Sequence, residues 1–103
     1  MIYVIDHNDS FTHNVVHQLS LFDDVVCDNF NQINNSKLEK ASVIVFSPGP
    51  GNPKNYPITS RIYKKFKGRK KIIGICLGFQ QILHCEGAEI IEQKKIYHGF
   101  QSL

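Results

Sequence analysis

The fold is decided by Lys71-Ile72-Ile73-Gly74-Ile75-Cys76-Leu77-Gly78-Phe79-Gln80. An apolar, β-branched run passes at Cys76 directly into residues with helical spacing, which predicts a buried strand that turns sharply into a helix. Gly74 and Gly78 stand two residues on either side of Cys76, where such a turn is too crowded for side chains. We call this turn the elbow. It would place the Cys76 thiol at the sheet edge and at a helix N-terminus, whose dipole favours an anion.

The rest of the chain alternates apolar runs with helical patterns, which is typical of a doubly wound α/β domain with a mostly parallel, flavodoxin-like sheet. We expect the strand order 2-1-3-4, with the loops that follow the strands at one edge. The expected strands are residues 1–5, 24–27, 41–46 and 72–75, with further candidates at 88–91 and 95–97. Cys27, in the second strand, is expected to be a small apolar filler.

Three helices should precede the elbow helix, which should end at Glu86-Gly87. Asp9 or Ser10 is the expected N-cap of the first helix, and Ser36-x-x-Glu39 reads as a capping box for the second. The third should end at Gly68, a residue suited to the position after a helix. Two apolar faces are expected, Phe11, Val15, Val16 and Leu19 in the first helix and Ile58, Ile62, Tyr63 and Phe66 in the third. Two polar faces should oppose them, His13, His17 and Gln18 in the first helix and Arg61, Lys64, Lys65 and Lys67 in the third.

A second stretch that could take part in binding or catalysis is Ser47-Pro48-Gly49-Pro50-Gly51, directly after the third strand. Pro/Gly runs usually form ordinary turns. In this run, however, proline stiffens the backbone and glycine leaves N–H groups uncovered. The loop also leaves the carboxyl end of a strand, where ligands bind in open α/β sheets.

The alternative for Cys76 is an inert core thiol, the commoner fate of a buried cysteine, and the flanking glycines favour the elbow.

These motifs resemble those of the class I glutamine amidotransferases. The resemblance lies in Gly-Ile-Cys-Leu-Gly-Phe-Gln at 74–80, Ser-Pro-Gly-Pro-Gly at 47–51 and Asp-Ser-Phe-Thr-His-Asn at 9–14. Among these enzymes the subunits that serve anthranilate and aminodeoxychorismate synthases are most similar. Phe79 and His13 depart mildly from the usual pattern. A weak match, His98-Gly99, resembles a pair near the partner surface of these relatives.

The resemblance implies a role for each matching residue. Cys76 would be the nucleophile, and the N–H groups of Gly49 and Leu77 would stabilise the oxyanion. Gly49, Pro50, Gly51 and Gln80 would bind glutamine. Ammonia would pass to a partner synthase subunit that uses chorismate, in tryptophan or folate synthesis. Nothing in the resemblance calls for a metal or cofactor.

The resemblance also implies a His-x-Glu pair that completes a catalytic triad. His84-Cys85-Glu86 has these letters but lies on the helix that Cys76 begins. At about 1.5 Å of rise per residue it cannot return to the thiol. We therefore expect residues 1–103 to be the N-terminal part of a single, truncated amidotransferase domain, inactive alone. The alternative is a catalytically dead binding or regulatory module, which DNA sequence beyond codon 103 would distinguish.

Composition and charge narrow the remaining classes of function and the cellular compartment. Three cysteines without metal-ligand spacing favour a reducing cytoplasm over disulfides or zinc. The basic tract 64–71 is better explained as a solvated helix end than as a nucleic-acid patch, and no membrane segment is expected. A flavodoxin-like cofactor site is disfavoured because the expected turn at residues 6–10, after the first strand, carries the carboxylates of Asp6 and Asp9, which would repel a phosphate. An uncovered apolar edge beyond the Cys76 strand would favour self-association.

Overall fold

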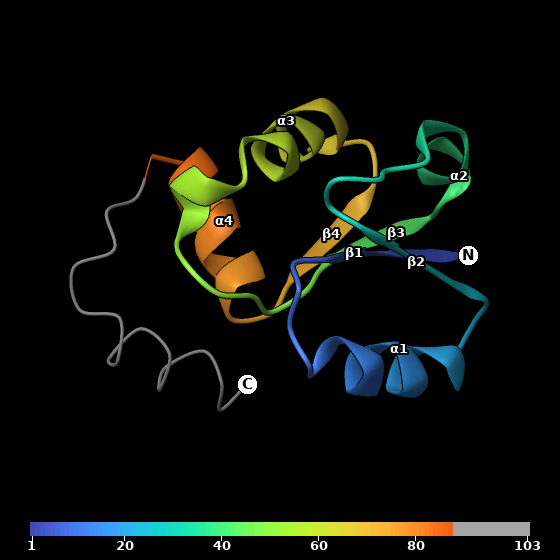
Figure 1. Ribbon diagram of the computed structural model, residues 1–103. Coiled ribbons are helices and arrows are strands. Elements are labelled where there is room, and N and C mark those ends of the chain that lie inside the picture. Colours follow the sequence, from blue (N-terminus) through green and yellow to red (C-terminus); the bar gives the residue numbers. More distant parts are fainter. Residues whose placement is uncertain (88–103) are drawn as a thin grey trace.

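The computed structural model describes residues 1–87 and contains one parallel sheet with helices on both faces (Figure 1). The spatial order of its strands is β2-β1-β3-β4, as the sequence predicts. The strands are β1 (Ile2–Asp6), β2 (Val25–Asn29), β3 (Val43–Phe46) and β4 (Lys71–Gly74). The helices are α1 (Thr12–Ser20), α2 (Asn35–Lys40), α3 (Pro57–Phe66) and α4 (Leu77–Cys85), with a short 3-10 turn, η1 (Pro53–Asn55).

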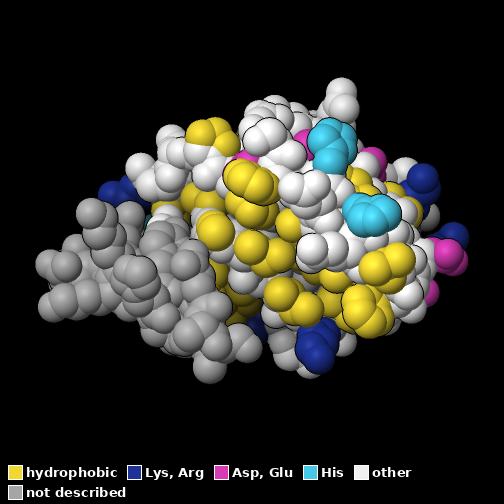
Figure 2. Space-filling view, turned by 90° about the horizontal axis from the view of Figure 1, so that it is seen from below, with side chains coloured by type: hydrophobic (Ala, Val, Ile, Leu, Met, Phe, Trp, Pro, Cys, Tyr) yellow, Lys and Arg dark blue, Asp and Glu magenta, His cyan; other side chains and the backbone are white. Residues whose placement is uncertain are grey.

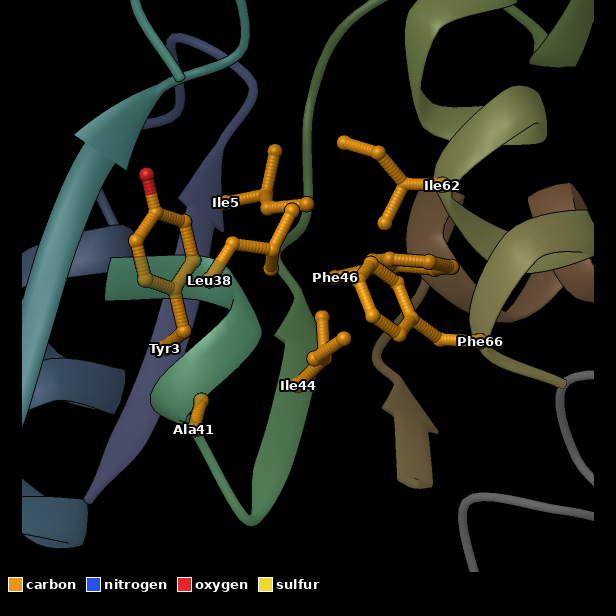
Figure 3. Close-up of a cluster of buried hydrophobic side chains, with 8 residues drawn as sticks. All are labelled: Tyr3, Ile5, Leu38, Ala41, Ile44, Phe46, Ile62 and Phe66. Atoms are coloured by element: carbon orange, nitrogen blue, oxygen red, sulfur yellow. The ribbon is translucent and has the colours of Figure 1, made fainter. Parts of the chain in front are cut away.

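The register of the sheet sends alternate side chains of each strand to opposite faces. Tyr3, Ile5, Ile44 and Phe46 face the α2 and α3 side, where they pack with Leu38, Ala41, Ile62 and Phe66 (Figure 3). Ile2, Val4 and Val45 face α1 and meet Val15, Val16 and Leu19. Both faces of the central strands are therefore buried, which explains their uninterrupted apolar sequence.

The expected helix starts are wrong in detail. The N-cap of α1 is Phe11, and the Asp9 carboxylate instead accepts a hydrogen bond from the Phe11 N–H, 2.9 Å away, in the turn before the helix. Phe11 is 63% exposed and does not join the apolar face of α1. The N-cap of α2 is Asn34, whose side chain accepts from the Lys37 N–H at 3.0 Å. An Asn one residue before the helix thus replaces the predicted Ser36 capping box.

The two outer strands of the described sheet are less buried than their sequences predict. β2 begins one residue later and ends two residues later than expected, and Cys27 is exposed rather than a core filler. Ile73 of β4 is 39% exposed, because in the described residues β4 pairs only with β3. Figure 2 shows hydrophobic side chains gathered on the face that carries α1. The strand candidates at 88–91 and 95–97 and the His98-Gly99 match lie outside the described residues.

The third helix follows its prediction closely, except that Ile58 is exposed and Thr59 takes the buried position. α3 ends before Gly68, whose φ of +80° suits glycine. Cations of the basic tract pair locally: Lys65 and Arg69 with Glu39, and Lys67 with Glu86. These contacts favour the interpretation of the basic tract 64–71 as a solvated helix end over that of a nucleic-acid patch. Among residues 1–87, no helix has the length and apolar character needed to cross a membrane.

Candidate active site

The elbow places Cys76 in a backbone conformation that few non-glycine residues adopt. Its φ is 54° and its ψ is −111°, and it is the exposed N-cap residue of α4. A Cβ on Gly74 would lie 2.5 Å from the carbonyl oxygen of Gly78, and a Cβ on Gly78 would overlap the carbonyl oxygen of Phe46. The two glycines therefore allow strand and helix to meet at the angle that exposes the thiol. Backbone strain of this kind clusters at functional sites.

Two backbone N–H groups belong to residues that line the same cleft as Cys76, namely Gly49 and Leu77. Leu77 is the first residue of α4, so its N–H has no acceptor within the helix. Gly49 packs against the same residue: a Cβ built on Gly49 would lie 2.8 Å from Leu77 Cδ2. Within residues 1–87 neither N–H group has a hydrogen-bond acceptor. Both are therefore free to donate to a bound ligand.

A cleft of about 610 Å³ joins these groups to the predicted substrate residues. Gly49, Gly51, Cys76, Leu77 and Gln80 all line it, whereas Pro50, also predicted, does not. The sequence prediction missed the opposite wall, which comes from α1 and the turn before it. That wall consists of Asp9, Phe11, Asn14, Val15 and Gln18. The exposure of Phe11 is explained by this position beside the cleft.

The first half of the Ser47–Gly51 loop rests on a buried histidine that the sequence prediction treated as part of a turn. His7 is fully buried, and its backbone N–H donates to Ser47 Oγ at 2.9 Å. Its Nδ1 lies 3.1 Å from the Ser47 carbonyl oxygen, and its Nε2 lies 2.9 Å from Thr59 Oγ1. Burial lowers the His7 pKa, so the ring is neutral.

The second half of the loop is held by η1 and by Tyr56, the residue between η1 and α3, and α4 in turn holds these residues. The Tyr56 hydroxyl donates to the Pro50 carbonyl oxygen at 2.6 Å. Gly51 has a φ of +83°, and a Cβ there would meet Asn55 Oδ1 at 2.5 Å. Nε2 of the buried Gln81 donates to the carbonyl oxygens of Pro53 and Tyr56, at 2.9 and 3.1 Å. The contacts of Gln81 join residues that are distant in sequence, so no local sequence motif predicts them.

The other two thiols lie elsewhere. Although Cys27 is exposed as a residue, desolvation of its thiol and the nearby carboxylates of Asp6 and Asp28 raise its pKa to about 11. Cys85 is half-buried at the end of α4, with Sγ 3.9 Å from the Ser60 carbonyl oxygen. Within the described part of the chain, no group of three His, Cys, Asp or Glu side chains could hold a metal ion.

No histidine from residues 1–87 lines the Cys76 cleft. His7 lies beneath the Ser47–Gly51 loop with both ring nitrogens engaged, and His13 and His17 are exposed on α1. His84 is exposed in the last turn of α4. The described residues therefore bring the predicted nucleophile and the predicted oxyanion donors to one cleft that no described histidine lines.

Comparisons with known proteins agree with the motifs. A family model described as glutamine amidotransferase class-I matches residues 3–103. Anthranilate synthase component 2 of Lactococcus lactis is 39% identical over 99% of this chain and 52% of its own length. Aminodeoxychorismate/anthranilate synthase component 2 of Bacillus subtilis is 34% identical over 96% of this chain and 53% of its own.

The fold has a solved counterpart in the crystal structure of a Thermoplasma acidophilum protein assigned to GMP synthase as one of its subunits. The TM-score is 0.69 and the sequence identity 28%, over 85% of this chain and 45% of that one. The chain thus spans about half the length of the curated relatives it matches. With the family model covering nearly all of its residues, the chain belongs to the class I glutamine amidotransferases.

Proposed function

We propose that this chain supplies the nucleophile, oxyanion hole and glutamine site of an amidotransferase subunit that delivers ammonia to a chorismate-using synthase. The observation that carries the proposal is the meeting of Cys76, the Gly49 loop and the Leu77 N–H at one cleft. The names of the relatives, anthranilate and aminodeoxychorismate synthase components, support the synthase partner. Residues 1–103 would form the N-terminal part of the single domain, acting in the cytoplasm.

The proposed chemistry uses these groups in two steps. The Cys76 sulfur attacks the side-chain carbonyl carbon of glutamine, and the carbonyl electron pair moves to the oxygen between the two N–H groups. When the carbonyl re-forms, the C–N bond breaks and leaves a thioester. One oxyanion donor is typically worth roughly 10²–10³ in rate. The leaving nitrogen needs a proton, and water must later be activated. General acid–base catalysis of these steps typically contributes roughly 10²–10⁴.

Acylation of Cys76 can be measured separately from complete turnover of glutamine. The γ-4-nitrophenyl ester of glutamate has a leaving group that departs as the anion, so it needs no acid. We expect the 103-residue chain to release a stoichiometric burst of 4-nitrophenolate, abolished in Cys76→Ser, and to hydrolyse glutamine negligibly. Glutamine should slow the burst by competition. A wild-type chain without a Cys76-dependent burst would overturn the proposed function.

Thiol labelling tests the same site independently. Iodoacetamide at pH 8 should label Cys76 before Cys27, because a pKa of about 11 leaves the Cys27 thiol protonated there. Labelling of Cys27 should become prominent only as the pH approaches 11. Mass-spectrometric mapping with and without glutamine checks both points. Faster labelling of Cys27 or Cys85 in the folded chain would contradict the elbow as the reactive site.

A second candidate function is the binding or regulatory module. It is favoured by one observation, the lack of a histidine at the cleft among residues 1–87. Such a module would bind the synthase without acylation by the ester, so the burst distinguishes the two functions.

Self-association through the half-exposed β4 edge stays a prediction, which sedimentation at micromolar concentration would check.

A further inference from the structure

We propose that His7 is a positioning residue that aims the Gly49 N–H into the oxyanion hole through Ser47. This inference rests on the proposed function and assigns a role to a buried side chain that the catalytic chemistry does not use. His7 lies 40 residues before Ser47 in sequence, at the end of the neighbouring strand β1. We call His7, Ser47 and Thr59 the loop anchor.

The protonation of His7 follows from its partners. The Ser47 carbonyl oxygen can only accept, so the Nδ1 atom 3.1 Å away carries the proton and donates it. Nε2 is then the acceptor for the Thr59 hydroxyl, at 2.9 Å. Phe30 and Tyr56 pack their rings against the imidazole. Every polar atom of the buried ring is therefore used in holding β3 and α3 to the end of β1.

Ser47 transmits this constraint to the next peptide. Its Oγ accepts from the His7 backbone N–H at 2.9 Å and donates to the Pro48 carbonyl oxygen at 2.8 Å. The Pro48 carbonyl and the Gly49 N–H belong to one planar, trans peptide group and point in opposite directions. Fixing the carbonyl toward the buried Ser47 side therefore turns the N–H to the other side, where Gly49 lines the Cys76 cleft.

Close packing limits the freedom of the same peptide. A Cβ on Gly49 would lie 2.5 Å from His7 Cβ and 2.7 Å from the His7 carbonyl oxygen. Gly49 is thus held between His7 and Leu77, the residue that carries the second oxyanion donor. The anchor determines where the Gly49 backbone lies, and the Ser47 hydrogen bond determines which way its amide faces.

The test compares two reactions of Cys76 that differ in their need for an oxyanion. Acylation by the γ-4-nitrophenyl ester passes through a tetrahedral oxyanion as the S–C bond forms and 4-nitrophenolate departs. Alkylation by iodoacetamide is a direct displacement of iodide that forms no oxyanion. The ratio of the two rate constants therefore reports the oxyanion hole and cancels changes in thiol exposure.

We expect His7→Phe and Ser47→Ala to lower the acylation rate about 10-fold or more, since mis-aiming a donor loses part of the roughly 10²–10³ that one donor supplies. Alkylation should change by less than about twofold, because the elbow is untouched. His7→Asn should retain most of the acylation rate, since its amide nitrogen can replace Nδ1 as donor to the Ser47 carbonyl. His17→Phe, the same substitution at an exposed site on α1, is the matched control.

The outcomes separate this inference from the proposed function. A wild-type chain without the Cys76-dependent burst overturns both. A burst that persists at an unchanged ratio in folded Ser47→Ala and folded His7→Phe overturns the positioning role alone. If His7→Phe does not fold by circular dichroism, Ser47→Ala carries the decision, with loss of ratio supporting the role. An equal fall in both reactions would mean a general structural role and would also overturn the proposal.

Discussion

The elbow and the Ser47–Gly51 loop lie on either side of one cleft, yet they are held in place by different means. At the elbow, backbone packs on backbone, and Gly74 and Gly78 are needed because a Cβ would meet main-chain atoms. The loop is held by hydrogen bonds from buried side chains, chiefly those of His7 and Tyr56. Steric exclusion tolerates almost no change, whereas separate hydrogen bonds can be lost one at a time.

This contrast leads to a first prediction, with the largest effect. Gly78→Ala should destabilise the fold by about 3 kcal/mol or more, because its Cβ would overlap the Phe46 carbonyl oxygen in a packed interior. Gly68→Ala is the matched control: nothing lies within 4 Å of its Cβ, and only its φ of +80° costs energy, about 1–2 kcal/mol. Urea unfolding measures both. Gly78 lies within α4 and has no positive φ, so a loss no larger than that of Gly68→Ala would show that crowding is not what makes the elbow need glycine.

On the loop side, Gln81→Met should cost about 2 kcal/mol, because it removes the buried side-chain hydrogen bonds to the carbonyls of Pro53 and Tyr56, each of which keeps only a backbone donor. The unpaired Gln81 Oε1 is removed by the same change, which offsets part of the loss. Gln32→Met, at an exposed position, should change stability by less than about 0.5 kcal/mol. The comparison would fail if the two variants unfolded at the same urea concentration.

The same contrast explains which parts could be predicted from the sequence. The strand order and the elbow follow from apolar runs and from glycine spacing, which are local patterns. The loop anchor does not, because nothing near His7 indicates that Ser47 and Thr59 lie beside it. The predicted N-caps were wrong because other residues within two positions took the cap instead. Asn34 caps α2 in place of Ser36, and Phe11 stands at the N-cap of α1 in place of Asp9 or Ser10. The burial expected of Ile73 was wrong because burial depends on neighbouring strands rather than on the sequence of the strand itself.

Acid should weaken the loop anchor more than the elbow. The His7 pKa is lowered by burial, and the hydrogen bond to the Ser47 backbone and the charge of Asp6 only partly oppose this. The unfolded chain therefore binds a proton below its ordinary pKa of about 6.5 that the folded chain does not, so stability falls as pH drops below that value. The slope contributed is at most about 1.4 kcal/mol per pH unit. His7→Asn should remove this part of the pH dependence. Identical urea midpoints against pH for both proteins would show that His7 is not buried neutral.

The smallest effect is expected where a single hydrogen bond is lost at the far end of the loop. Tyr56→Phe removes the donor to the Pro50 carbonyl but keeps the ring that packs on His7 and Phe30. We expect a loss of about 1 kcal/mol in unfolding free energy. Burial raises the Tyr56 pKa, so the hydroxyl remains a donor through neutral pH.

Tyr63→Phe provides the control for this change, since its hydroxyl donates to Glu86 on the surface, away from the cleft. If hydrogen bonds hold the loop, only Tyr56→Phe should weaken the protection of Cys76 by glutamine against iodoacetamide. The elbow should stay intact in both variants, with unchanged alkylation in the absence of glutamine. Weaker protection in Tyr63→Phe as well would mean that α3 as a whole, rather than the Pro50 hydrogen bond, holds this end of the loop. The two sides of the cleft would then be held by the same kind of packing.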